Sequence, residues 1–463
     1  MNLALSLLYA AEQKPHADAL VSETTRLTYE ELRERAARIA GGLAAHGVEP
    51  GDRVGGVLAN EPETVELYWG CQWLGACLVP LSHRISEADL DYCIRNCGAE
   101  VVVRDPSEVR ELVATDEHPG AVDLDEREPS IQLYTSGTTG RPKGVPRSHR
   151  AERAGGMSQV LQHGLRSGHR TLGVMPLYHT MGIHSLLAAS VVGGCFVAQP
   201  SWDPEHALEL IERQRVDSLY LAPTLFYDLV HHPRFDDFDT SSVRAVAYAG
   251  SPMTSALVER VAAAFELEIF VNHYGSTEIY TFSVQREQRS KPGCAGRPAL
   301  NSRLRLDPPG EGEVLCHMSS DEAFTGYWNR PDADEKAIRS GWYHTGDVAR
   351  IDEDGDLWVV GRVDDMVISG GENIHPVEVE NVLARAPGVG EVAVVGAADD
   401  RWGQRVVAYV VADGHVTSEE LDAYCLESDA LARFKRPREY RFVPELPKSP
   451  SGKILRRMLR DES

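Results

Sequence analysis

The chain has 463 residues, of which 42% are hydrophobic and 25% are charged. This length exceeds a single hydrophobic core and predicts two or three domains of an ordinary folded protein. The formal net charge of −23 at pH 7 argues against a nucleic-acid surface, because phosphate binding needs a basic face. An anionic cofactor still fits where basic residues converge, and residues 434–457 are much more basic than the rest.

The apolar N-terminus, residues 1–11, is predicted to be the first helix of the fold. It lacks a basic region and a clear cleavage site and is too short for a membrane span. The chain also has eight cysteines without a CxxC pair or a histidine at zinc-finger spacing, at positions 71, 77, 93, 97, 195, 294, 316 and 425. Free buried thiols are typical of a reducing compartment, so we expect a cytoplasmic protein.

The first two thirds of the chain alternate between predicted helices and strands. Thr28 and Glu31 form a capping-box pattern, and apolar residues then recur at helical spacing until Gly47. A strand at residues 53–59 follows at once. The same alternation recurs at residues 207–213 before 218–222, and at residues 257–265 before 268–274. It predicts stacked α/β layers with a largely parallel sheet.

The last third of the chain has a different pattern. Residues 293–360 are short alternating segments broken by DPPG at 307–310 and DEDG at 352–355, which predicts a small β subdomain. A compact α+β unit is expected after GRVDD at 361–365, and we place the domain boundary at Asp364. The expected elements of this unit are a helix near residues 376–384, strands at 392–396 and 405–411, and a helix from residue 418.

The predicted fold class is therefore α/β. A large N-terminal domain, residues 1–363, combines layered α/β subdomains with the small β subdomain. A small α+β C-terminal domain, residues 364–463, follows it. No internal repeat is visible.

The most informative segment is YTSGTTGRPKGV at residues 134–145, directly after a predicted strand. Glycines let backbone N–H groups approach phosphate oxygens, hydroxyl groups donate further hydrogen bonds, and Lys143 adds a positive charge. A solvated turn is the alternative for a loop of this composition. A Walker-type loop fails on spacing, because Gly144 stands where that motif needs a magnesium-binding Ser or Thr.

These twelve residues resemble the signature of the adenylate-forming superfamily, which comprises acyl-CoA synthetases, luciferases and peptide-synthetase adenylation domains. Further segments resemble the family's motifs in the family's order: MPLYH at 175–179 for the acyl site, YGSTE at 274–278 for adenine and metal, WYHTGD at 342–347 for ribose, GRVDD at 361–365 for the hinge, and KSPSGK at 448–453 for the catalytic lysine. Together the motifs cover about residues 130–455.

Four other segments most resemble 4-chlorobenzoyl-CoA ligases and other aryl- and acyl-CoA ligases: HGLR at 163–166, residues 361–376, RWGQ at 401–404, and FKRP at 434–437. The resemblance implies an acid–thiol ligase that forms an acyl-adenylate and pyrophosphate from a carboxylate and ATP. Transfer to coenzyme A then gives acyl-CoA and AMP. The expected cofactors are ATP, Mg²⁺ and coenzyme A, and the expected substrate is an aromatic or bulky cyclic carboxylic acid.

Two alternative functions stay open. One is a stand-alone adenylation enzyme that loads the pantetheine arm of a carrier protein. The other is a non-catalytic acyl-nucleotide-binding protein, which the presence of Lys453, Glu278 and Asp347 disfavours. The oligomeric state is also open, with a homodimer among the alternatives.

The adenylation step must neutralise charge on the phosphates and on the attacking acid. By the resemblance, Thr277 contacts the α-phosphate, Glu278 holds Mg²⁺, and Lys453 bridges the acid and the α-phosphate, with His179 as a further catalytic residue. The β- and γ-phosphates are assigned to Thr135, Ser136, Thr138, Thr139 and Lys143, and Gly137 and Gly140 of the same loop are assigned to ATP binding. The adenosine is assigned to Tyr274, which stacks on adenine, and to Gly275, Asp347 and Arg362.

Thioester formation in this family follows a rotation of the C-terminal domain, and Asp364 matches the hinge position. A turn made of Ser369, Gly370 and Gly371 resembles the one that admits pantetheine. The nucleotide end of coenzyme A is assigned to Arg84, Trp402, Phe434 and Arg436. Arg438 replaces a lysine of the 4-chlorobenzoyl-CoA ligases and keeps the charge, but not the geometry.

The resemblance also assigns the acyl pocket, to Gly156, His179, Thr180, Met181, Tyr220, Gly250, His273, Gly275 and Tyr280. The 4-chlorobenzoyl-CoA ligases have phenylalanine at Gly156, aliphatic residues at Thr180 and His273, and methionine at Tyr280. These departures predict a pocket that is roomier on one side and more polar. The alternatives are that Gly156 serves helix packing and that His273 is a hydrogen-bonded core histidine.

Overall fold

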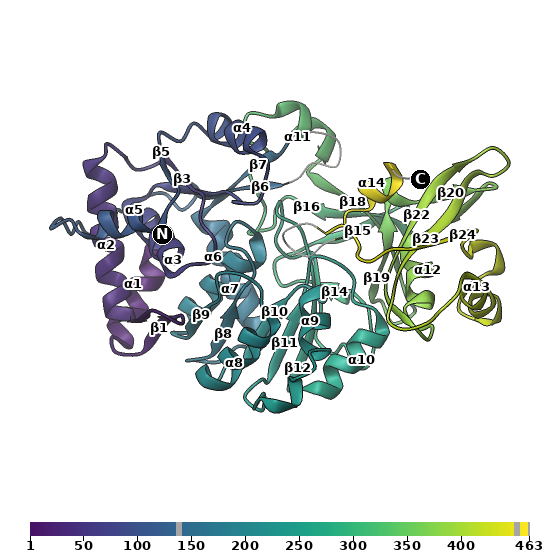
Figure 1. Cartoon of the computed structure of the whole chain (residues 1–463). Helices are drawn as coiled ribbons and strands as arrows, with labels where there is room; N and C mark the ends of the chain where they lie inside the picture. Colours follow the sequence, from purple (N-terminus) through teal and green to yellow (C-terminus); the bar gives the residue numbers. More distant parts are fainter. Residues whose placement is uncertain (136–140, 449–453, 462–463) are drawn as a thin grey trace.

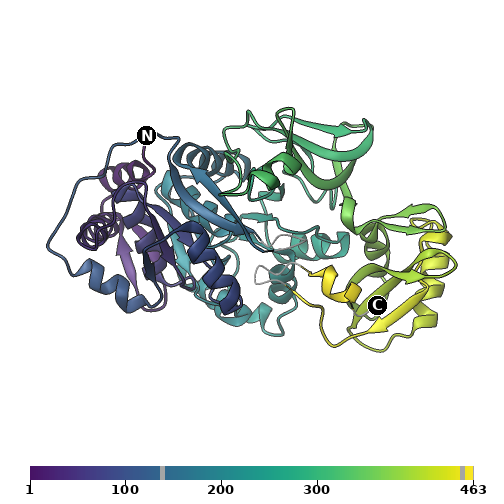
Figure 2. The ribbon, with the colours of Figure 1, turned by 90° about the horizontal axis from the view of Figure 1, so that it is seen from above.

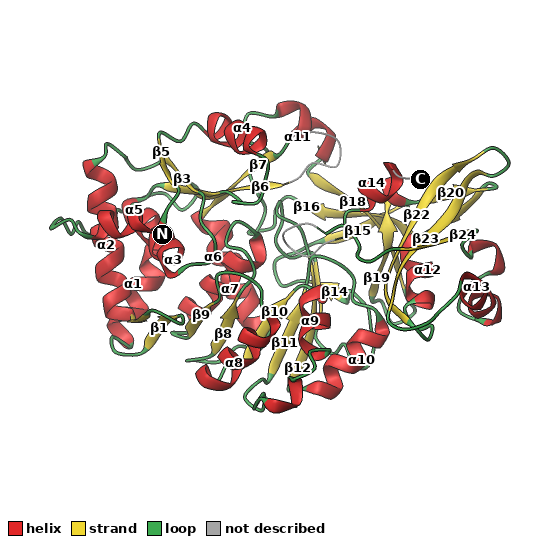
Figure 3. Ribbon diagram, viewed as in Figure 1, coloured by secondary structure: helices red, strands yellow, loops and turns green. Residues whose placement is uncertain are grey.

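The computed structural model describes residues 1–135, 141–448 and 454–461 (Figure 1). These described residues form four sheets with their helices, and Figure 3 shows helices on the outer faces and between the two sheets of the N-terminal part. The helices of the N-terminal part are α1 (Ala4–Gln13), α2 (Tyr29–Ala45), α3 (Pro62–Leu74), α4 (Glu87–Cys97), α5 (Pro106–Val113), α6 (His149–Gln162), α7 (Thr180–Val191), α8 (Pro204–Gln214), α9 (Pro223–Val230), η1 (Phe235–Asp237), α10 (Ser255–Ala264) and α11 (Pro331–Ala337).

A five-stranded sheet carries the phosphate loop. Its strand order is β5-β3-β4-β6-β7, and all neighbours are parallel except β6 and β7. Its strands are β3 (Arg53–Gly56), β4 (Cys77–Pro80), β5 (Val101–Val103), β6 (Pro129–Thr135) and β7 (Lys143–Ser148). The predicted strand at residues 53–59 is thus shorter, because the chain leaves the sheet after Gly56.

A nine-stranded sheet is the second layer, with the order β14-β13-β12-β11-β10-β8-β9-β1-β2. The strands β12, β11, β10, β8, β9 and β1 are parallel to their neighbours in this order. Strands β13 and β14 at one edge and β2 at the other pair in the antiparallel direction, so the sheet is largely parallel, as predicted. Its strands are β1 (Asp18–Val21), β2 (Arg26–Thr28), β8 (Arg170–Gly173), β9 (Cys195–Ala198), β10 (Ser218–Leu221), β11 (Ala245–Tyr248), β12 (Ile269–Tyr274), β13 (Ser283–Gln285) and β14 (Arg297–Pro298).

Helices α6 and α7 pack against each other between these two sheets (Figures 1 and 3). Helix α6 contacts β6 and β7, whereas α7 contacts β8 and β9. The N-terminal caps of both helices therefore lie next to segments that carry predicted site residues. The predicted capping box at Thr28 and Glu31 is present at the start of α2.

The small β layer and the C-terminal unit complete the fold, and the C-terminal unit lies at one end of the molecule (Figure 2). The β layer consists of β15 (Leu304–Asp307), β16 (Glu311–His317), β17 (Ile338–Arg339), β18 (Trp342–Ile351) and β19 (Leu357–Arg362). The C-terminal unit consists of η2 (Val363–Asp365), β20 (Val367–Ser369), β21 (Glu372–Ile374), α12 (Pro376–Leu383), β22 (Val389–Asp399), β23 (Gly403–Ala412), α13 (Ser418–Glu427), η3 (Arg433–Lys435), β24 (Glu439–Phe442) and α14 (Arg456–Asp461).

Strands β22 and β23 are longer than predicted because both of their faces are covered. Val394 and Val406 face a core with α12 and α13, whereas Val395 and Val407 face Leu459 of α14. All eight cysteines are buried and free, as predicted. Among the described residues, no helix combines the length and the apolar character that a membrane span requires.

Candidate active site

The phosphate loop connects two paired strands of the five-stranded sheet. Thr135 ends β6 and lies opposite Lys143, the first residue of β7, so the two ends of the loop are adjacent. Thr135 Oγ1 is buried and has no hydrogen-bond partner among the described residues, and its contact with phosphate stays a prediction. The other predicted loop contacts lie outside the described residues: Ser136, Gly137, Thr138, Thr139 and Gly140.

Lys143 and Glu278 both contact the side chain of Tyr327. Lys143 Nζ lies 3.8 Å from the centre of the Tyr327 ring, and the Tyr327 hydroxyl donates a 2.6 Å hydrogen bond to Glu278 Oε1. Burial lowers the pKa of the Lys143 ammonium, and the charge of Glu278 opposes that shift. Here a cation suits phosphate and a carboxylate suits a hard metal ion. Tyr327 was not among the predicted residues; the aromatic segment FTGYW at 324–328 is its local signal.

The predicted ribose and adenine residues form one cluster from two sheets. Asp347 of β18 lies directly opposite Arg362 of β19, and Arg362 Nη1 is 3.0 Å from Asp347 Oδ1. Tyr274, at the end of β12, donates a 2.7 Å hydrogen bond from its hydroxyl to Asp347 Oδ2. Burial, together with the charge of Asp347, raises the pKa of Tyr274 well above its usual range. Arg362 and Tyr274 thus hold the Asp347 carboxylate in place. Its oxygens are hydrogen-bond acceptors, which suits the hydroxyls of a ribose.

The acyl motif and the α-phosphate motif come together although 97 residues separate them. The Thr180 hydroxyl lies 3.4 Å from the Thr277 hydroxyl. His179 caps α7, because its Nδ1 accepts a 3.3 Å hydrogen bond from the Met181 backbone N–H. The residues predicted to bind the acid and the α-phosphate therefore share one end of α7.

Three predicted pocket residues, Tyr220, His273 and Tyr280, are buried together. The Tyr280 hydroxyl donates a 2.8 Å hydrogen bond to Gln159 Oε1 and lies 3.3 Å from the Tyr220 hydroxyl. His273 Nδ1 lies 3.1 Å from His163 Nε2. These contacts join polar side chains, and their place in an acyl pocket stays a prediction. Gln159 and His163 were not among the predicted site residues, although Gln159 lies on α6, the helix that carries Gly156, and His163 is the C-cap of that helix.

The predicted pocket glycines have different steric surroundings. A Cβ atom at Gly275 would lie 1.7 Å from the Tyr280 carbonyl oxygen, so no larger residue fits this turn. A Cβ atom at Gly156 would lie 3.1 Å from Leu187 Cβ of α7, and one at Gly250 would lie 3.9 Å from Met181 Sδ. The contact with Leu187 gives Gly156 a helix-packing role, and its place in the acyl pocket stays a prediction.

The predicted pantetheine turn and Trp402 are in contact. Gly370 and Gly371 have φ values of 61° and 86°, and the Gly370 N–H donates a 2.8 Å hydrogen bond to the Trp402 carbonyl. A Cβ atom at Gly370 would lie 2.8 Å from the Trp402 ring, so glycine lets the indole cover the turn, which begins at Ser369. Trp402 is 39% exposed, and the Arg438 guanidinium lies 5.9 Å from the centre of its ring.

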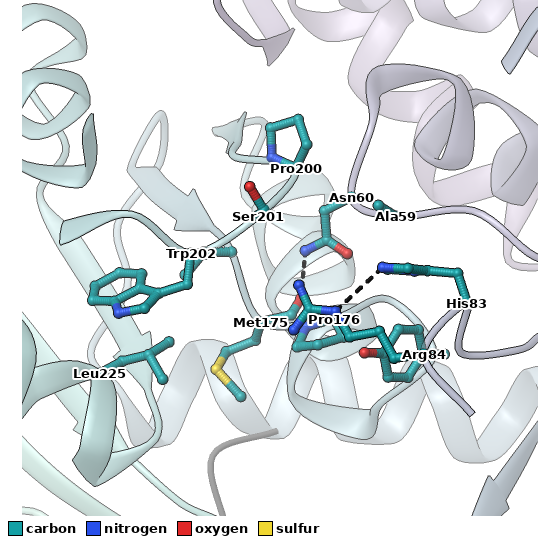
Figure 4. Close-up of a pocket in the computed structure, with 12 residues that line it drawn as sticks. Ala59, Asn60, His83, Arg84, Met175, Pro176, Pro200, Ser201, Trp202 and Leu225 are labelled. Atoms are coloured by element: carbon teal, nitrogen blue, oxygen red, sulfur yellow. Dashed lines mark hydrogen bonds between the residues drawn. The ribbon is translucent and has the colours of Figure 1, made fainter. Parts of the chain in front are cut away.

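The remaining predicted coenzyme A residues lie on two parts of the chain. Phe434 is 45% exposed on the C-terminal unit, and Arg436 Nε donates a 2.8 Å hydrogen bond to Asp422 Oδ1. Arg84 instead lines a pocket of the N-terminal part, where its Nε lies 3.3 Å from His83 Nε2 (Figure 4). The other residues that line this pocket include Asn60, Met175, Pro176, Tyr178, Ser201 and Trp202.

The predicted hinge lies in η2, at the start of the C-terminal unit and directly after the β layer. Asp364 is exposed, and its carbonyl accepts a 3.1 Å hydrogen bond from Arg460 Nη1. Asp365 forms ion pairs with Arg460 and, at 3.8 Å, with Arg456. Helix α14 is thereby tied to the hinge segment. The catalytic role of Lys453 stays a prediction, because residues 449–453 lie outside the described residues.

Buried neutral histidines predict a loss of stability in acid. Burial lowers the pKa of His149 to about 4 and that of His273 to about 3, from 6.5. Below pH 6.5 the unfolded chain binds protons that these folded histidines do not bind, so the free energy of unfolding should fall until the folded pKa is reached. Each group contributes about 1.4 kcal/mol per pH unit.

Urea unfolding at pH 7.5 and pH 5.5 measures this effect. A His273→Leu variant lacks one of the titrating groups and should lose less stability between the two pH values than the parent chain does. An equal loss in parent and variant would contradict the assignment of a neutral, buried His273.

Comparisons with known proteins agree with this geometry. The sequence model of the AMP-binding enzyme family matches residues 7–328, and that of the AMP-binding enzyme C-terminal domain matches residues 378–453. A feruloyl-CoA synthase from Amycolatopsis is 36% identical over 479 aligned positions, with 96% of each chain covered. A 4-chlorobenzoate–CoA ligase from Arthrobacter is 33% identical, with 100% of this chain and 95% of the ligase covered.

The fold is also similar to that of a solved structure. The o-succinylbenzoate CoA synthetase from Bacillus subtilis, in complex with an acyl-adenylate intermediate, superimposes with a TM-score of 0.88 at 29% identity. The alignment covers 98% of both chains. The similarity thus extends over the N-terminal part, the β layer and the C-terminal unit.

Proposed function

Because the chain belongs to the AMP-binding enzyme family, as an AMP-forming acid–thiol ligase, we propose that it joins an aromatic or bulky cyclic carboxylic acid to coenzyme A. The observation that carries this proposal is a set of contacts around the turn that follows β12: Lys143 and Glu278 both contact Tyr327, and Tyr274, just before this turn, donates to Asp347. On this proposal, Lys143, Thr277, Glu278 and Asp347 supply a cation, a hydroxyl, a carboxylate for a metal ion and a carboxylate for the ribose.

The nucleotide is proposed to bind with its ribose at Asp347, which Arg362 and Tyr274 hold in place. Lys143 and Thr135 then offer a positive charge and a hydroxyl to the terminal phosphates, and Thr277 offers a hydroxyl to the α-phosphate. Glu278 suits Mg²⁺, because this ion needs one or two carboxylates beside the phosphates rather than an all-protein cluster. Bound Mg²⁺ would neutralise phosphate charge during the displacement.

Another acidic group does not compete for this role. Asp352, Asp354 and Asp356 lie within 4.8 Å of one another, but Lys291 pairs with all three carboxylates. The lysine already neutralises the cluster. Glu278, in contrast, directly follows Thr277 and contacts the Tyr327 side chain, which also contacts Lys143.

The acid is proposed to bind beside Thr180 and Tyr280, at the end of α7. Support comes from the ring-shaped, polar side chains there: the Tyr280 ring stacks on His184 and lies 4.5 Å from the His273 ring, between centroids. The two curated relatives carry aromatic acids in their names, which agrees with such a pocket. His179 is proposed to orient the acid from the cap of the same helix.

A screen of carboxylic acids for ATP-dependent pyrophosphate release tests the proposal. Coenzyme A is added to each active acid, and the thioester is detected by mass spectrometry. Adenylate without thioester, together with transfer to a pantetheinylated carrier protein, would favour the carrier-loading alternative. Nucleotide binding without pyrophosphate release for any acid would favour the non-catalytic alternative.

Trp402→Ala is expected to raise the KM for coenzyme A about tenfold and to leave ATP–pyrophosphate exchange nearly unchanged. The indole is exposed over the Gly370 turn, with Arg438 nearby, and belongs to the transfer step rather than to adenylation. Arg436→Ala should shift the same parameter. Phe442→Ala is the matched control, because Phe442 is similarly exposed, at 44%, outside the predicted group. An unchanged KM in both test variants would contradict the coenzyme A assignment.

A further inference from the structure

A buried ion pair follows the phosphate loop directly. Arg147 lies on β7 and Glu152 on α6, and both side chains are 0% exposed. Arg147 Nε donates to Glu152 Oε1, and Arg147 Nη1 donates a 2.8 Å hydrogen bond to the backbone carbonyl of Thr277. The guanidinium thus binds the segment assigned to the α-phosphate and the metal.

The register of β7 explains how this one strand reaches both Thr277 and Glu278. Side chains alternate along a strand, so Lys143, Val145 and Arg147 lie on the same face. Val145 packs with Ile279 in the core. Lys143 reaches Glu278 through Tyr327, and Arg147 reaches the Thr277 carbonyl.

Glu152 extends the contact to α7. Its Oε2 lies 3.4 Å from His184 Nε2, and His184 stacks on Tyr280 with ring centroids 3.4 Å apart. A Cβ atom at Gly155 would lie 2.1 Å from His184, so the glycine provides the space for the imidazole. Burial alone would raise the pKa of Glu152, but Arg147 and His184 bring it down to about 2.

Stability is a weak reason for such a pair, because the desolvation of two charges offsets much of their attraction and apolar replacements are often neutral or stabilising. Orientation is the stronger reason. A planar guanidinium with two fixed partners sets the direction of the Thr277 carbonyl, whereas an apolar side chain would leave that carbonyl free to turn.

We propose that Arg147 and Glu152 are positioning residues for adenylation, which hold the turn of Thr277 and Glu278 in register with the phosphate loop. The inference rests on the proposed function, because that function gives Thr277 and Glu278 their contacts with the α-phosphate and the metal. The new element is that the contacts of Thr277 and Glu278 with the nucleotide and the metal depend on Arg147 and Glu152, which themselves contact neither ligand.

The test is the double variant Arg147→Met with Glu152→Leu, which removes both charges and keeps the volume. At saturating ATP, acid-dependent ATP–pyrophosphate exchange should fall about tenfold or more, and half-maximal activity should need severalfold more Mg²⁺. Transfer of a supplied acyl-adenylate to coenzyme A should change less than about twofold. Calorimetric binding of Mg·ATP should weaken about tenfold without any acid present.

The matched control is Arg35→Met with Glu66→Leu. This pair joins α2 to α3 at 2.7 Å with Glu66 buried, away from the site, and its removal should leave exchange and Mg²⁺ dependence unchanged. Should the test variant fold poorly, Arg147→Lys retains the charge but cannot reach both partners, and should show the same split between the half-reactions.

The inference would be overturned if the test variants kept the exchange rate and the Mg·ATP affinity of the parent chain. It would also be overturned if both half-reactions lost the same share of activity, in proportion to the fraction of unfolded protein. The proposed function fails separately, when the parent chain shows no acid-dependent exchange with any acid. In that case the calorimetric comparison still decides whether the ion pair positions the nucleotide site.

Discussion

Lys453→Ala is expected to lower acid-dependent ATP–pyrophosphate exchange by about 10²–10³-fold, and to leave transfer of a supplied acyl-adenylate to coenzyme A nearly intact. The lysine resembles the family residue that bridges the acid and the α-phosphate, so its charge should act in the adenylation transition state alone. Pre-steady-state assays of the two half-reactions measure each rate separately.

The surroundings of this residue provide its control. Lys448 and Ile454 form a β-bridge on either side of the segment, and Lys448 Nζ lies 2.7 Å from Glu391 Oε1. Lys448→Ala removes a neighbouring positive charge that already has a partner, and an exposed ion pair of this kind contributes about 0–1 kcal/mol. It should leave both half-reactions close to parental rates. Equal losses in the two half-reactions of Lys453→Ala would contradict its assignment.

Asp347→Ala should cost about 2–4 kcal/mol in kcat/KM for ATP, which corresponds to about 30–1000-fold. The carboxylate is proposed to accept both ribose hydroxyls, and it also holds the Arg362 guanidinium and the Tyr274 hydroxyl. Its removal therefore leaves the partly buried Arg362 guanidinium without its ion-pair partner and the Tyr274 hydroxyl without the carboxylate acceptor, in addition to the lost ligand contact. Exchange kinetics at varied ATP and calorimetry with AMP measure the effect.

Tyr274→Phe is the graded comparison. It removes one hydroxyl and keeps the ring, so a loss of about 1 kcal/mol is expected. A second comparison uses 3′-deoxy-ATP, which should bind the parent chain less well than ATP does but should bind Asp347→Ala about equally well. If Asp347→Ala still discriminates between the two nucleotides as the parent does, Asp347 does not contact the ribose.

The order of the chemical motifs could be predicted from the sequence because each motif is local. The hydroxyl- and glycine-rich loop before Lys143, the turn that contains Glu278 and the strand that contains Asp347 each hold their residues within a few positions. The α/β layering could be predicted for the same reason, since capping residues such as Thr28 and the period of apolar side chains act over short distances.

The partners of these residues were decided by the tertiary structure. Register between β18 and β19 places Arg362 against Asp347, and the packing of β7 beside the turn after β12 places Arg147 on the Thr277 carbonyl. Helix packing also gives Gly156 its contact with Leu187. These contacts join residues 15 to 130 positions apart or cross from one helix to another. They depend on strand order and interhelical distance, which no local pattern of side chains specifies.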